Sequence, residues 1–307
     1  MGLSRFLLQK IWGLAEKQDK KRLASIKSLP GVQCVKDIAY LNDGDPMHQL
    51  NLYWPEEENG NIPTIIDIHG GGWMYGDKDL NRPYCEYLAY KGFRVMGMSY
   101  RLLPHTDLQG MVQDIFASIH YLENHAAEYG FDLGNVLLTG DSAGGHLTSL
   151  VMCIQQSEKL QKIYGVEPFG FNFTAAAICN GVCEMHDIYA FTGFLCRGSD
   201  KEMQKMLLGR QGASAPWNGH MNFSQVIGEA KPLPLMVISS ENDPFYVHNQ
   251  WLLETLRQMR WPCETVIWKK EDGKHLGHVF QVANPEWEES KVTNDKMLYF
   301  FREAFCK

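Results

Sequence analysis

Residues 140–144, Gly-Asp-Ser-Ala-Gly, have the types and spacing of a serine nucleophile. Apolar runs on either side of them predict a strand, a sharp turn and a helix. Glycines at 140 and 144 would let the chain turn tightly enough to leave Ser142 at the tip, and the helix would direct its positive end toward negative charge forming there. A tight loop without chemistry is the alternative, because short glycine patterns also arise by chance.

A second glycine cluster, HGGGW at residues 69–73, follows the apolar run 64–68. A tetrahedral intermediate needs hydrogen-bond donors aimed at its oxyanion, and successive glycines offer bare amides at close range. Gly71 and Gly72 are the candidate donors, joined by the amide of Ala143 after the nucleophile. Alone, the cluster could be a flexible turn or an anion-binding nest. Together with the turn at Ser142, it predicts an oxyanion hole.

A serine hydroxyl needs a base to take its proton, and the base needs an acid to orient it. Asp243 directly follows the predicted strand 233–240, and His278 lies in the loop after the predicted strand 264–268. We therefore expect a catalytic triad of Ser142, Asp243 and His278. His275 is the competing base and is expected to face solvent, Glu241 is the second choice of acid, and an ordinary surface turn is the alternative for the acidic segment.

Alternating runs at 35–54 predict an antiparallel hairpin, and the chain then alternates between strands and helices. This pattern predicts an α/β fold in one domain, residues 1–307, with a mostly parallel central sheet and helices on both faces. Ligands bind beyond the carboxyl ends of such strands, where Ser142 would lie. The strands are expected at 64–68, 93–100, 135–139, 174–180, 233–240 and 264–268, and the helices at 80–91, 107–129, 146–156, 247–260 and 290–305.

Two segments stand outside this alternation. Residues 184–231 are rich in aromatic residues, glycine and serine and are expected to form a small inserted cap. The candidates for substrate contact are Trp73, Phe191, Phe194 and Trp217. Residues 1–30 have apolar side chains at helical spacing, which predicts an amphipathic helix. We expect it to pack against the body of the protein, with a cover over the site or contact with a membrane surface as alternatives.

The composition excludes several classes of protein. The net charge of -7 without long basic runs argues against nucleic-acid binding. The eight cysteines form no CxxC pair and show no zinc-site spacing with histidine, so no metal or other cofactor is expected. Free thiols in a reducing cytoplasm are the simpler interpretation. No apolar run is long enough for a transmembrane segment, and homo-oligomer formation stays open.

The motifs resemble the hormone-sensitive-lipase-like branch of the α/β-hydrolases, which includes bacterial carboxylesterases and carbohydrate acetyl esterases. The strings HGGGWMYGDK (69–78), YRLLP (100–104), LTGDSAGGHL (138–147), NDP (242–244) and GHVF (277–280) fall in family order over roughly residues 35–305. The resemblance implies the α/β-hydrolase fold, the same triad, and an oxyanion hole at Gly71, Gly72 and Ala143. Two departures are His105, where the branch often has an acid, and the cap, which matches nothing in the branch.

The expected function is therefore that of a serine esterase that cleaves a small-molecule ester, with a preference for short acyl chains. Three alternatives stay open at this point: an amide hydrolase of the formamidase or exopeptidase type, a non-catalytic ligand-binding relative, and a membrane-associated lipase. The intact set of serine, aspartate and histidine argues against the non-catalytic alternative.

Overall fold

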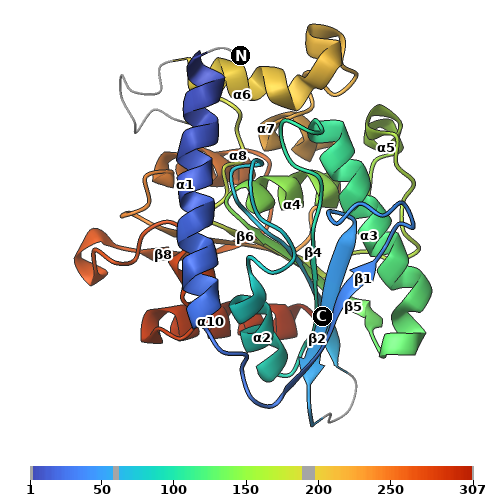
Figure 1. The fold of residues 1–307 in the computed structure, drawn as a ribbon, viewed down its shortest axis with the longest axis vertical. Coiled ribbons are helices and arrows are strands. Elements are labelled where there is room, and N and C mark those ends of the chain that lie inside the picture. Colours follow the sequence, from blue (N-terminus) through green and yellow to red (C-terminus); the bar gives the residue numbers. More distant parts are fainter. Residues whose placement is uncertain (1–2, 58–61, 189–197, 306–307) are drawn as a thin grey trace.

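An eight-stranded sheet forms the centre of the computed structural model, which describes residues 3–57, 62–188 and 198–305 (Figure 1). The strand order is β1-β2-β4-β3-β5-β6-β7-β8, in which β1 pairs antiparallel with β2, β2 pairs antiparallel with β4, and the other pairs are parallel. The strands are β1 (Val32–Ala39), β2 (Gln49–Pro55), β3 (Pro63–Ile68), β4 (Arg94–Met98), β5 (Asp132–Asp141), β6 (Ala175–Cys179), β7 (Leu235–Ser240) and β8 (Cys263–Trp268). The predicted hairpin and parallel sheet are both confirmed.

Helices cover both faces of the sheet, as the alternation predicted. On one face, α2 (Arg82–Tyr90) and α10 (Glu288–Phe305) enclose a core that includes Tyr84, Phe93 and Phe301. On the other face lie α3 (Leu108–Tyr129), α4 (Ala143–Ile154) and α8 (Tyr246–Gln258). The central strands are apolar along most of their length because both of their faces are buried.

The remaining described helices are short, apart from the first. The stretch between β6 and β7, where the cap was expected, is mostly helical in its described part. In chain order, the remaining helices of the whole described chain are α1 (Leu3–Ser25), α5 (Glu158–Tyr164), α6 (Ser199–Leu208), α7 (Phe223–Val226) and α9 (Phe280–Ala283). Short 3-10 turns lie at Gly209–Ser214, Ile227–Glu229 and Lys270–Asp272. Helix α5, a two-turn helix whose start is capped by the hydroxyl of Ser157, was not predicted from the sequence.

The N-terminal helix α1 lies across the front of the domain in Figure 1, from α6 at the top of the view to α2 and α10 at the bottom. Leu8 is fully buried against the main core. At the C-terminal end of α1, the guanidinium of Arg82 at the start of α2 donates to the carbonyl oxygens of Leu23 and Ile26 at 3.2 and 2.8 Å. The helix is therefore fastened at both ends to the body of the protein.

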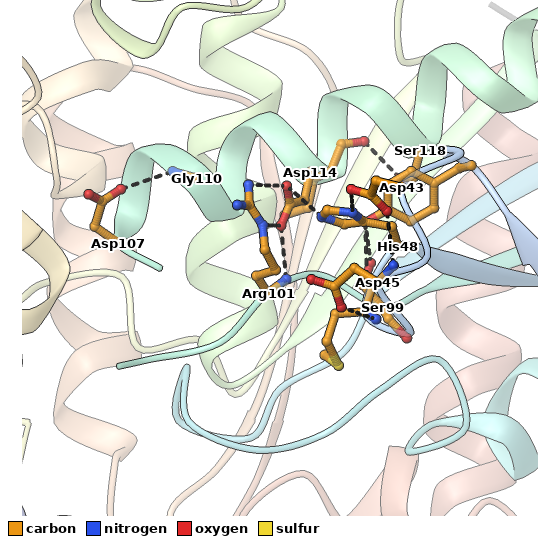
Figure 2. Close-up of polar contacts among 12 residues, drawn as sticks. Asp43, Asp45, His48, Ser99, Arg101, Asp107, Gly110, Asp114 and Ser118 are labelled. Carbon is orange, nitrogen blue, oxygen red and sulfur yellow. Dashed lines mark hydrogen bonds and ion pairs between the residues drawn. The ribbon is translucent and has the colours of Figure 1, made fainter. Parts of the chain in front are cut away.

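A polar cluster around the buried side chains of Asp114 and His48 ties the segment before α3 to the loop between β1 and β2 (Figure 2). The carboxylate of Asp114 accepts three hydrogen bonds from Arg101, one from its amide and two from its guanidinium, at 2.7–2.9 Å. His48 lies between two carboxylates, with Nδ1 donating to Asp43 at 2.7 Å and Nε2 3.3 Å from Asp114. Asp114 therefore holds the segment around Arg101 in place.

Candidate active site

Ser142 stands at the turn between β5 and α4 in a strained backbone conformation, with φ 53° and ψ -116°. Such a conformation costs about 1–3 kcal/mol in a residue other than glycine, so the surroundings must enforce it. The Ser142 amide donates to the carbonyl oxygen of Cys179 at 2.9 Å, and the Val182 amide donates to the Ser142 carbonyl at 3.2 Å. A side chain at Gly144 would overlap the carbonyl oxygen of Ile68, which explains the glycine there.

A continuous hydrogen-bonded path joins the three predicted triad residues. The Ser142 hydroxyl lies 2.8 Å from Nε2 of His278, and Nδ1 of His278 lies 3.0 Å from both carboxylate oxygens of Asp243. The other candidates lie apart from this path. His275 is half exposed and faces Glu289, while Glu241 pairs with Lys269 at the surface. The structure thus brings together Ser142, Asp243 and His278, each beyond the carboxyl end of a parallel strand.

Two polar residues that the sequence analysis did not select hold Asp243 in place. Asn180 donates to Asp243 Oδ2 at 2.6 Å, and Gln281 donates to the side-chain oxygen of Asn180 at 3.2 Å. The Phe245 amide donates to the other carboxylate oxygen at 2.8 Å. A polar residue directly after the apolar strand β6 was a signal that could have found Asn180. Nothing local marks Gln281.

The charges of the acid and the base stabilise each other. Burial alone would raise the pKa of Asp243, but the charge and hydrogen bonds of His278, the Phe245 amide and Asn180 outweigh burial and lower this pKa. Burial alone would lower the pKa of His278, but Asp243 opposes it through its charge and hydrogen bond and raises this pKa. Asp243 is therefore ionised at neutral pH and favours the imidazolium form of His278.

The glycine loop reaches the nucleophile through Gly71, which lines the cavity that holds Ser142. Gly71 and Gly72 have positive φ values of 95° and 58°, and no acceptor among the described residues takes a hydrogen bond from their amides or from that of Ala143. Asp141 braces the loop by accepting from the Gly70 amide at 3.0 Å. Unpaired amides at these three positions are what the predicted oxyanion hole requires.

Of the four aromatic residues proposed for substrate contact, Trp73 and Trp217 lie among the described residues, and both are away from Ser142. Trp73 is buried and its indole N–H donates to His146, while Trp217 is buried and its indole N–H donates to the Leu207 carbonyl oxygen. Neither lines the cavity at Ser142, because each indole is held inside the core by its own hydrogen bond. Phe191 and Phe194 lie outside the described residues.

The cavity at Ser142 is small, about 60 Å³, and α1 forms part of its wall through Trp12, Asp19 and Arg22. Packing against the body of the protein was the first expectation for residues 1–30, and covering the site was an alternative. The helix does both. No local pattern marks Trp12 or Arg22, because their neighbours in the cavity are distant in sequence.

The described part of the chain holds no grouping of three or more histidine, cysteine, aspartate or glutamate side chains suited to a metal ion. In the same residues, no helix is both long and apolar enough to cross a membrane.

Comparison with known proteins identifies the family. The BD-FAE family matches residues 50–253, which is more than half of the chain. The chain belongs to this family. Esterase B from Lactobacillus rhamnosus, a solved structure, is 42% identical, with a TM-score of 0.93 over 98% of this chain and 95% of that one. The predicted α/β-hydrolase fold is confirmed, and the esterases named among the relatives agree with the resemblance to carboxylesterases.

The curated relatives of this BD-FAE member are esterases that match over shorter segments. Carboxylesterase NlhH of Mycobacterium tuberculosis is 31% identical over 33% of this chain, and the matched segment spans 32% of that relative's length. A probable isoprenylcysteine alpha-carbonyl methylesterase of Arabidopsis thaliana is 32% identical over 36% of this chain and 23% of its own length. The matched segments thus span a third or less of these two relatives.

Proposed function

We propose that this chain is a carboxylesterase that hydrolyses small-molecule esters of short acyl chains through Ser142, His278 and Asp243. The observation that carries the proposal is the path from the Ser142 hydroxyl to His278 at 2.8 Å and on to Asp243 at 3.0 Å. The esterase names of the relatives, including the 42% identical esterase B, support the reaction class.

In the acylation step, Nε2 of His278 accepts the hydroxyl proton while Ser142 Oγ attacks the ester carbonyl carbon. Asp243 fixes the tautomer by accepting from Nδ1–H and stabilises the imidazolium that forms. The amides of Gly71, Gly72 and Ala143 donate to the oxyanion of the tetrahedral intermediate. The intermediate collapses as the alcohol takes the proton from Nε2 and leaves, so that the acyl group stays on Ser142.

Water then completes the cycle by the same route. His278 accepts a proton from water, the hydroxide attacks the acyl carbon, and the oxyanion again lies against the three amides. Collapse returns the proton to Ser142 Oγ and releases the carboxylic acid.

The size of the cavity supports a short acyl chain. Ligand pockets commonly measure about 300–1,000 Å³, whereas the space at Ser142 is about 60 Å³ and is bounded by Leu80, Val279 and Val282. Esterase B has been solved inhibited by a C4-C4 SN3 tributyrin phosphonate, which supports reaction with butyryl esters in a 42% identical relative.

A reducing compartment such as the cytoplasm is also part of the proposal. Six cysteines of the described chain are free thiols, and four of these, at 85, 153, 179 and 183, are buried. Buried thiols that form no disulfide agree with a chain that folds in a reducing compartment.

The proposal is tested by hydrolysis of p-nitrophenyl acetate, butyrate, octanoate and palmitate. We expect the wild type to act fastest on acetate or butyrate, and Ser142→Ala and His278→Ala to lose more than a thousandfold in kcat. His275→Ala is the matched control and should keep wild-type activity, because this histidine faces solvent near Glu289. Full activity in Ser142→Ala would overturn the mechanism.

A further inference from the structure

Trp12 of α1 stands between two spaces of very different size. On one side is the cavity of about 60 Å³ that holds Ser142 and His278. On the other is a groove of about 890 Å³ that runs beside α1 and the segment 101–105. Trp12 and Tyr75 line both spaces. These two side chains therefore form the partition between the nucleophile and the groove.

The two rings of the partition stack on each other and on the oxyanion loop. Their centroids are 5.7 Å apart, with 28° between the ring planes. A side chain at Gly72 would overlap the indole of Trp12, so the indole lies directly against the backbone of a proposed oxyanion donor. An ester bound at Ser142 would thus meet Trp12 as soon as it extended beyond the cavity on this side.

Polar contacts hold the partition in this position. The Tyr75 hydroxyl donates to Asp19 on α1 at 2.8 Å. Arg22, also on α1, donates to the carbonyl oxygen of Ala283 at 2.6 Å, five residues after the proposed base His278. The helix is thus bonded to both sides of the cavity, and the indole is not a loosely attached surface group.

We propose that Trp12 is a specificity-determining residue that limits the size of the ester by closing the cavity off from the groove. The inference rests on the proposed function, since it concerns which esters reach Ser142. Removing the indole would join the cavity of about 60 Å³ to the groove of about 890 Å³. The joined space would lie near the upper end of the range that ligand pockets usually have, about 300–1,000 Å³.

The groove also indicates what the enlarged site would accept. Its lining combines the charged residues Glu16, Lys20 and Asp77 with the apolar side chains of Met47 and Met74. Such a surface can take an acyl chain along the methionines or a larger alcohol with polar groups. Two substrate series distinguish these possibilities: p-nitrophenyl acetate against octanoate varies the acyl group, and ethyl butyrate against tributyrin varies the alcohol.

The test compares kcat/KM for these four esters in the wild type, Trp12→Ala and Trp12→Phe. We expect Trp12→Ala to raise the ratio of bulky to small substrate at least tenfold in one or both series, and Trp12→Phe to raise it less. The series that responds identifies the part of the ester that faces Trp12. Leu14→Ala is the matched control: Leu14 is 61% exposed on the same helix, so its ratios should equal those of the wild type.

The proposal is overturned if a folded Trp12→Ala protein keeps, in both series, a ratio of kcat/KM for bulky to small substrate within twofold of the wild type. If this variant does not fold, Tyr75→Leu removes the other half of the partition and is held to the same criterion. A failure of the proposed function would look different, because the wild type would then be inactive on all four esters.

Discussion

The indole Nε1 of Trp73 donates a hydrogen bond to Nδ1 of His146 at 3.2 Å, and the opposite ring nitrogen of His146 bonds to the carbonyl oxygen of Met221 at 2.7 Å. With Nδ1 accepting and Nε2 donating, the imidazole is neutral, in agreement with burial that lowers its pKa to about 4. This one side chain connects the oxyanion loop, the helix after Ser142 and the segment between β6 and β7.

The first prediction concerns His146. His146→Leu would leave the buried N–H of Trp73 and carbonyl of Met221 without partners, at about 1–3 kcal/mol for each group. We expect the free energy of unfolding, measured in urea, to fall by about 2–5 kcal/mol. His105→Leu, at an exposed position, should change it by less than about 0.5 kcal/mol. Equal effects of the two substitutions would show that the His146 bonds contribute little.

The second prediction concerns the pH dependence of hydrolysis. His278 must be neutral to accept the Ser142 proton, so kcat/KM should fall as pH drops through the pKa of His278. Asp243 raises this pKa through its charge and hydrogen bond. Asp243→Asn should therefore move the acid limb of the profile to lower pH, besides lowering kcat by about ten-thousandfold. A pH–rate profile whose acid limb stays in place would contradict the assignment of Asp243 as the partner of His278.

The third prediction concerns Asp67, which is buried below the oxyanion loop and accepts a hydrogen bond from Asn81 at 3.0 Å. Burial, with a further contribution from the charge of Asp141, raises its pKa from 3.8 to about 8. Between these values the folded protein binds a proton that the unfolded chain has released, so stability falls as pH rises.

Asp67→Asn removes this titration while keeping the shape of the side chain. From pH 5 to pH 9 the wild type should lose at least about 1 kcal/mol more stability than the variant, which corresponds to roughly one pKa unit. Denaturant unfolding at several pH values measures the difference. Parallel curves for the two proteins would mean that Asp67 is not protonated in the folded state.

The fourth prediction compares two aspartates at the start of α3, both visible in Figure 2. Asp114→Ala removes the buried partner of Arg101 and should cost about 2–4 kcal/mol. Asp107→Ala removes only the N-cap bond to the Gly110 amide and should cost about 1 kcal/mol. Thermal or urea unfolding of the two variants gives the comparison. A larger effect at Asp107 would contradict the role given to the polar cluster around Asp114.

The local features of the chain were predictable from its sequence. The turn at Ser142, the glycine loop at 70–72 and the order Ser142, Asp243, His278 each follow from residues close together in the chain or from their position after a strand. The same holds for the hairpin and for the parallel strands, because hydrophobic period and strand–helix alternation are local signals. The register of the sheet then places the ends of β3, β5, β7 and β8 at one edge.

Contacts between distant segments were decided only by the tertiary structure. Sequence spacing contains nothing that puts Trp12 against Gly72, Arg22 on the Ala283 carbonyl, or Gln281 on Asn180. The aromatic candidate Trp217 has the residue type of a pocket lining, yet its indole is bonded inside the core. Residue types and order indicated which reaction to expect. The packing of α1 over the glycine loop decided how much space lies around Ser142, because a cavity is what remains after segments far apart in sequence have packed together.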